Sequence, residues 1–175
     1  MEGLTWLERL GRRVPLYIQI KRGWLSVTDL PRDNTFETLT RVAYVPRAKR
    51  FEPRPITDAE LASLRREWGD RLQVGDGFSH PRLPIGNFES AEHAFRYAIR
   101  QVLPHRRGRP GRLVVHVQEA WEGGLTDVEL RAFRDMSINA GAITLGFLLE
   151  PMTLSNQDVL ALLNGTYSGP VLLQK

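Results

Sequence analysis

The order of the segments constrains the fold of this chain most strongly, beginning with three β-rich runs in its first quarter. The runs cover residues 14–20, 24–30 and 35–45, and only a few turn-forming residues, among them Gly23 and Pro31, separate each run from the next. Connections this short join neighbouring antiparallel strands. The sequence therefore predicts a three-stranded antiparallel meander.

Helical and strand-like segments alternate after the meander. Capping-box patterns open two of the predicted helices, because Thr57 and Thr126 each precede a glutamate by three residues. The predicted helices are 58–68, 88–103, 126–139 and 156–163; the predicted strands are 113–117 and 143–149; the predicted loops are 46–55 and 105–112, with only short extended pieces such as 83–85 between residues 71 and 86. The order favours a mixed α/β fold, with about five strands in one sheet and helices packed on it. It is the order of the ribonuclease-H-like half of an actin-type fold.

The first 13 residues differ in pattern from the remainder, so we expect an amphipathic helix at 1–13 and a single domain at 14–175. The apolar face of this helix would consist of Leu4, Trp6, Leu7 and Leu10. Two interpretations stay open for that face. It could dock against the core of the domain, or it could make peripheral contact with the inner face of a membrane.

The composition excludes several kinds of function. The chain has no cysteine, which removes disulfide frameworks, thiol nucleophiles and cysteine-ligated metal sites. No apolar run approaches the roughly 20 residues of a membrane span, so we expect a soluble, cytoplasmic protein. The four histidines lack metal-ligand spacing, and neither a Walker loop nor a nucleophile elbow is present. We expect no metal and no cofactor. The histidines are His80, His93, His105 and His116.

Several stretches between residues 84 and 152 resemble the bacterial actin-like MreB proteins. They are 85–88, 112–115, 124–134, 139–142 and 147–152. They correspond to a helix and strand of that family, followed by a glutamate-bearing helix, a Gly-Ala turn and a Glu-Pro-Met end. The resemblance implies an actin-like, ribonuclease-H-like lobe that matches the first half of MreB.

The first predicted hairpin departs from that family. In nucleotide-binding actin-like proteins this hairpin carries an aspartate and a Gly-Thr-rich turn, because backbone N–H groups must approach the phosphates closely. Here residues 19–24 read Gln-Ile-Lys-Arg-Gly-Trp, with bulky side chains and no acid. The printed sequence also covers only one of the two lobes between which such proteins bind nucleotide. We therefore expect a one-lobed relative without a bound nucleotide.

Glu129 has two interpretations. The resemblance aligns it with the residue that orients the hydrolytic water in MreB-like proteins. The simpler interpretation is structural, because Thr126 and Glu129 can satisfy each other's backbone N–H groups in a capping box. We favour the structural role, since the hairpin offers no phosphate site for a water molecule to attack.

Two basic segments form a candidate polyanion patch. One segment carries Arg106, Arg107, Arg109 and Arg112, and the other carries Arg47, Lys49, Arg50 and Arg54. They could bind a polyanion together if the fold brings them close. The alternative is a pair of solvated loops, which we favour because only Phe51 supplies an aromatic side chain nearby.

These observations favour a non-catalytic, single-lobed actin-like module that acts by protein–protein interaction or self-association. The resemblance implies a role in cell shape or envelope organisation. One alternative is a nucleotide-dependent ATPase-type switch, completed by a second lobe from dimerisation or a partner chain. A second alternative is a polyanion-binding or nucleic-acid-binding domain, which we rank last.

Overall fold

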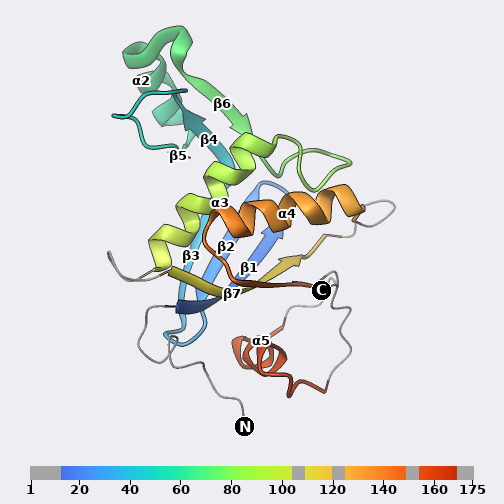
Figure 1. Ribbon diagram of the computed structural model, residues 1–175. Helices are drawn as coiled ribbons and strands as arrows, with labels where there is room; N and C mark the ends of the chain where they lie inside the picture. Colours follow the sequence, from blue (N-terminus) through green and yellow to red (C-terminus); the bar gives the residue numbers. More distant parts are fainter. Residues whose placement is uncertain (1–12, 104–108, 120–124, 149–153, 169–175) are drawn as a thin grey trace.

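The computed structural model describes residues 13–103, 109–119, 125–148 and 154–168 (Figure 1). The predicted N-terminal helix with Leu4, Trp6, Leu7 and Leu10 lies outside these residues. The strands are β1 (Arg13–Lys21), β2 (Trp24–Asp29), β3 (Asn34–Leu39), β4 (Arg41–Tyr44), β5 (Arg54–Pro55), β6 (Gln73–Asp76), β7 (Arg109–Val117) and β8 (Thr144–Leu148). The helices are α2 (Asp58–Trp68), α3 (Phe88–Val102), α4 (Asp127–Asn139) and α5 (Asn156–Leu163).

The large sheet has five strands in the order β3-β2-β1-β7-β8. Strands β1, β2 and β3 pair antiparallel, whereas β1, β7 and β8 pair in parallel, so the sheet is mixed. Helix α4 connects the parallel strands β7 and β8. The predicted mixed α/β fold, the predicted sheet of about five strands and the predicted β-α-β unit are therefore confirmed.

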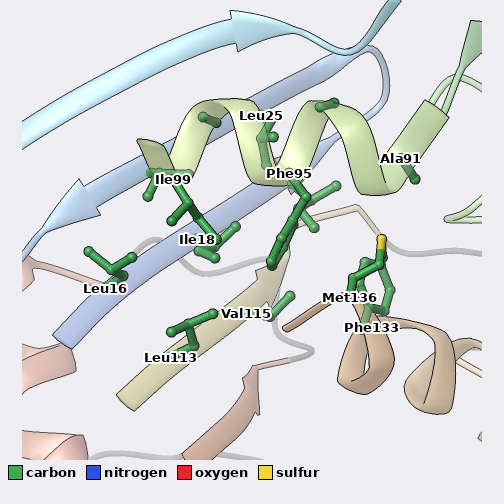
Figure 2. Packing of buried hydrophobic residues seen from close by; sticks show 14 of the residues in the cluster. Leu16, Ile18, Leu25, Ala91, Phe95, Ile99, Leu113, Val115, Phe133 and Met136 are labelled. Atoms are coloured by element: carbon green, nitrogen blue, oxygen red, sulfur yellow. The ribbon is translucent and has the colours of Figure 1, made fainter. Parts of the chain in front are cut away.

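Helices α3 and α4 cover one face of the large sheet (Figure 1). Alternate residues of the central strand β1, Leu16, Ile18 and Ile20, are fully buried on this face. Figure 2 shows Phe95 of α3 lying among these strand side chains, close to Phe133 of α4. This side of the sheet holds the main core of the protein.

Helix α5 covers the opposite face of the large sheet (Figure 1). The intervening residues of the central strands, such as Tyr17 and Val114, point to this side and pack with Val159 and Leu162 of the helix. The central strands are thus buried on both faces, which explains why β7 reads as a nearly continuous apolar run.

The third β-rich run of the sequence supplies two strands that belong to different sheets, which corrects the prediction of one strand at 35–45. Strand β3 ends at Leu39, and β4 begins at Arg41 in a small sheet with the order β5-β4-β6. The buried Thr40 lies between them, and its hydroxyl donates to Asp76 Oδ1 at 2.5 Å. The chain passes from the large sheet to the small sheet at this residue, and the hydrogen bond attaches the crossing point to the end of β6.

Strand β6 lies where the sequence predicts only short extended pieces, since Gly75 and Gly77 are of a residue type typical of turns. A β-carbon at Gly77 would lie 2.3 Å from the Cα of Ala91, and one at Gly75 would lie 2.2 Å from Ser90 Oγ. The glycines allow β6 and the residue after it to approach the first turn of α3 closely. The short extended piece predicted at 83–85 is not a strand, and the predicted loop at 46–55 ends in strand β5.

Strand β7 begins earlier than predicted, at Arg109 rather than at residue 113. Its first residues pair with the start of β1, across an irregularity between Val14 and Leu16. Arg109 and Arg112 therefore belong to a strand of the large sheet, not to the basic loop predicted at 105–112.

Candidate functional site

The β1–β2 hairpin turn lies at the edge of the large sheet where β1 and β7 end. Lys21 pairs with Trp24, and the two residues between them form the turn. Gly23 adopts a positive φ of 69°, which glycine tolerates and other residues avoid. Its N–H donates to the Phe78 carbonyl at 3.2 Å, so the turn is fixed to the segment that follows β6. The hairpin is therefore a well-anchored feature of this edge.

Glu119, which follows β7, binds the hairpin turn. The backbone N–H of Arg22 donates to Glu119 Oε1 at 3.0 Å, and the Arg22 side chain forms an ion pair with Glu119 Oε2 at 3.6 Å. The Arg22 guanidinium also donates to the Pro81 carbonyl at 3.2 Å. The N–H group of this turn thus donates to a carboxylate of the same chain. In the nucleotide-binding proteins that the sequence resembles, the N–H groups of the corresponding turn approach a phosphate.

Gln118 is the residue at this edge that the sequence analysis missed. Its side chain is 8% exposed, and among the described residues neither its Oε1 nor its Nε2 has a hydrogen-bond partner. Its backbone N–H donates to the Ile20 carbonyl at 3.0 Å. A polar side chain directly after a buried parallel strand is a signal that could have identified it, because ligands of open α/β sheets bind beyond these strand ends.

Thr126 and Glu129 form the capping box that the sequence predicted at the start of α4. Glu129 Oε2 accepts hydrogen bonds from the Thr126 N–H at 2.7 Å and from the Thr126 hydroxyl at 2.8 Å. The Thr126 hydroxyl oxygen accepts the Glu129 N–H at 3.3 Å. The Glu129 carboxylate is therefore engaged in holding its own helix terminus.

The residues of the candidate polyanion patch lie in different parts of the fold. Arg47 and Arg50 lie exposed in the loop after β4, and Arg109 lies exposed at the start of β7. Arg112 reaches the end of α5, where its guanidinium donates to the Leu163 carbonyl at 2.7 Å. Arg106 and Arg107 lie outside the described residues.

His116 is a buried residue of strand β7 in the large sheet. Its Nδ1 lies 2.5 Å from the Tyr17 hydroxyl, and burial raises the pKa of Tyr17 to about 12. Within the described parts of the chain, no three His, Asp or Glu side chains gather in a way that could hold a metal ion. None of the helices described is both long and apolar enough to cross a membrane.

Neither a protein-family model nor a curated protein matches the sequence. Among solved structures, MreB5 of Spiroplasma citri, which was solved bound to ADP, is similar with a TM-score of 0.50 and 10% sequence identity. This similarity covers 77% of our chain and 37% of MreB5. A MamK double helical filament is also similar, with a TM-score of 0.45, 12% identity, and coverage of 76% of our chain and 40% of MamK.

The chain therefore spans less than half the length of the solved structures that it matches. The five-stranded mixed sheet with helices on both faces agrees with the expected mixed sheet of about five strands with helices packed on it. At 10% identity the similarity to MreB5 concerns the fold alone. The chain has the mixed α/β fold of the bacterial actin-like proteins.

Proposed function

We propose that this chain is a non-catalytic actin-like module that acts by binding protein, first of all a second copy of itself. The observation that carries the proposal is the bond between the Arg22 N–H and the Glu119 carboxylate at the hairpin turn. A phosphate at this turn would have to displace the carboxylate or lie beside it. Two anions in contact repel each other strongly, so the carboxylate disfavours nucleotide binding here.

An exposed apolar region at the end of α4 supports the protein-binding part of the proposal. Ile138 is 57% exposed and Ile143 is 65% exposed. They lie on either side of a tight turn, in which the Gly141 N–H donates to the Ile138 carbonyl at 2.8 Å. Among the described strands, the adjacent strand β8 pairs only with β7 and is an edge strand of the large sheet. Apolar side chains next to an edge strand favour association.

Sedimentation velocity of the full chain over a range of concentrations tests this proposal. We expect reversible self-association that Mg-ATP does not change. Replacing Ile138 and Ile143 together by serine should raise the dissociation constant at least roughly tenfold, because burying an isoleucine contributes ~1.5–3 kcal/mol. The matched control is Val128→Ser, which removes an apolar side chain that is 78% exposed at the opposite end of α4.

A chain that stays monomeric at every concentration would contradict self-association. Affinity capture with the same variants then distinguishes binding to a different protein, because a partner that uses this region is lost from the double variant and kept by Val128→Ser. Equal behaviour of all variants in both assays would contradict the assigned surface.

The competing function is a nucleotide-dependent switch, which the ADP bound to MreB5 favours. In that case the unpartnered Gln118 side chain would be a candidate contact for the nucleotide, and Mg-ATP would strengthen association. The polyanion-binding alternative predicts retention on heparin that falls as salt rises and falls further when Arg47 and Arg50 are neutralised.

The proposal includes the cellular location of the protein. The actin-like fold, together with the resemblance, supports a cytoplasmic role in cell shape or envelope organisation, with contact to the inner face of the membrane through residues 1–13. Co-sedimentation with anionic liposomes tests the membrane contact when the full chain is compared with one that lacks residues 1–11. Loss of liposome binding at an unchanged melting temperature supports membrane contact, whereas a lowered melting temperature supports docking on the core.

A further inference from the structure

A pocket of about 500 Å³ lies between the loop that follows β4 and the first two turns of α3. Its volume is within the range of small-molecule sites. Most of the lining is apolar, and the loop supplies this part: Val45, Pro46, Ala48, Phe51 and Pro53. Tyr44 also lines the pocket and is only 6% exposed. The pocket is therefore a largely apolar hollow.

The loop that forms one wall is ordered by its own turns. The Ala48 N–H donates to the Val45 carbonyl at 3.1 Å, and the Phe51 N–H donates to the Ala48 carbonyl at 3.1 Å. Arg47 adopts a φ of 60° in the first turn, a conformation that glycine and asparagine favour. The edge of the Phe51 ring packs against Trp68 of α2, with 5.4 Å between ring centroids. The hydrogen-bonded turns thus fix the shape of this wall, and Arg47 within it has an uncommon backbone conformation.

The opposite wall carries Glu89 and His93 of α3. The Tyr44 hydroxyl donates to Glu89 Oε2 at 3.2 Å, and the Tyr44 and His93 rings lie 5.0 Å apart. Burial lowers the pKa of His93, so the imidazole is neutral at pH 7 and can donate a hydrogen bond without adding charge. Glu89, the one carboxylate among the described lining residues, thus already accepts a hydrogen bond from a tyrosine.

The cations of the pocket differ from the other arginines around it. Arg41 pairs with Asp58, Arg54 with Glu60 at 2.6 Å and Arg100 with Glu52 at 2.7 Å. In contrast, Arg47 and Lys49 line the pocket and form no ion pair within the described part of the chain. Two unpaired cations thus face an apolar hollow that contains one carboxylate.

We propose that this pocket binds a small organic anion, an aromatic or aliphatic body that carries a carboxylate, sulfonate or phosphate. The apolar body lies against Phe51, Pro53 and Tyr44, and the anionic group meets Arg47 and Lys49 at the loop. Such an assignment combines burial of apolar surface with charge-assisted hydrogen bonds, the two contributions that dominate small-ligand binding. It does not depend on the proposed self-association.

Two fluorescent probes with the same aromatic body test the assignment on the full chain. Anilinonaphthalene sulfonate carries an anionic group, and phenylnaphthylamine lacks it. We expect saturable binding of the sulfonate at a single site and at least roughly tenfold weaker binding of the neutral probe, because the neutral probe cannot form a charge-assisted hydrogen bond with Arg47 or Lys49. Equal affinity for the two probes would overturn the assignment.

Variants locate the site. Combining Arg47→Asn with Lys49→Gln removes both cations while keeping a residue that tolerates the positive φ at position 47, and it should weaken sulfonate binding at least roughly tenfold. Arg66→Gln, which removes an exposed cation of α2 that does not line the pocket, is the matched control and should leave binding unchanged. Amide shifts on titration should concentrate at residues 44–53 and 89–93. Shifts confined to another region, or unaltered affinity in the double variant, would contradict the assignment.

Discussion

Helices α3 and α2 both begin with a side-chain cap, yet they bury very different amounts of side chain. Asn87 caps α3, which lies on the large sheet and buries seven side chains, whereas Thr57 caps α2, which buries none. Polar and aromatic contacts hold α2 instead, including the ion pair between Arg41 and Asp58 and the contact between Phe51 and Trp68. The large sheet depends on apolar packing, and the region around α2 depends on pairs of side chains near the surface.

This difference has consequences for stability. Apolar packing contributes most of the free energy of folding, whereas exposed ion pairs contribute little each and weaken with salt. We therefore expect the residues from β4 to β6 to open locally before the large sheet unfolds.

Removing the aromatic ring of Phe95 should destabilise the protein most. The side chain is fully buried between α3 and the large sheet (Figure 2), and Phe95→Ala should lower the free energy of unfolding by about 3–5 kcal/mol. Urea denaturation followed by circular dichroism measures the change. Phe88→Ala is the matched control, because Phe88 begins the same helix but is 42% exposed, and it should cost less than about 1 kcal/mol. Similar losses for the two variants would contradict the account of the core.

The close approach of β6 to α3 predicts that alanine substitutions at Gly75 and Gly77 both destabilise the protein, and that a second substitution restores stability at Gly75 only. Gly77→Ala should cost about 1–3 kcal/mol, and Ala91→Gly should not rescue it, because the new methyl group meets the backbone of α3. Gly75→Ala meets the Ser90 hydroxyl instead, so Ser90→Ala should restore most of the loss. The melting temperatures of the two glycine variants and of the two double variants measure the loss and its rescue. Rescue at both positions, or at neither, would contradict the close approach.

The cap of α4 should have a moderate effect. Thr126→Ala removes the hydroxyl that accepts the Glu129 N–H and should cost roughly 1 kcal/mol, whereas Glu129→Gln keeps most of the cap and should cost less. Chemical denaturation measures both. If Glu129→Gln instead abolished a measurable ATP hydrolysis by the wild-type chain, Glu129 would be catalytic and the structural interpretation would be wrong.

The smallest effect is expected at Glu60 and depends on pH. Hydrogen bonds from the Thr57 N–H and from Arg54 lower the pKa of this carboxyl from 4.5 to about 2. A lowered folded-state pKa stabilises the fold above the unfolded pKa, and this contribution disappears as pH falls through the folded pKa. The stability difference between wild type and Glu60→Gln should therefore be constant above pH 5 and shrink between about pH 4.5 and 2. A difference that stays constant across that interval would contradict the assigned contacts.

The large sheet could be predicted because its signals are local. Short turns fixed the hairpins, the apolar run at 113–117 indicated a buried strand, and Thr126 with Glu129 marked the start of α4. Each signal depends on neighbouring residues and on the periodicity of burial. The order of these elements was then sufficient to predict a mixed sheet with helices packed on it.

The small sheet and the pocket could not be predicted, because they depend on contacts between distant residues. Gly75 and Gly77 look like turn residues until α3 lies against them. Thr40 divides a continuous β-rich run, and its hydroxyl bonds to Asp76, which is distant in the sequence. The sequence analysis singled out Arg47 for its charge. Nothing in the local pattern indicated that Glu89 and His93 would lie across a pocket from it.

The central claim is that the hairpin turn binds the Glu119 carboxylate of its own chain and does not accept a nucleotide phosphate. Calorimetric titration of the full chain with ATP and magnesium tests this most directly. We predict no saturable heat at millimolar nucleotide for the wild type. Tight binding that is lost when the hairpin is altered by Gly23→Val would contradict the account, and the chain would then be a nucleotide-dependent switch.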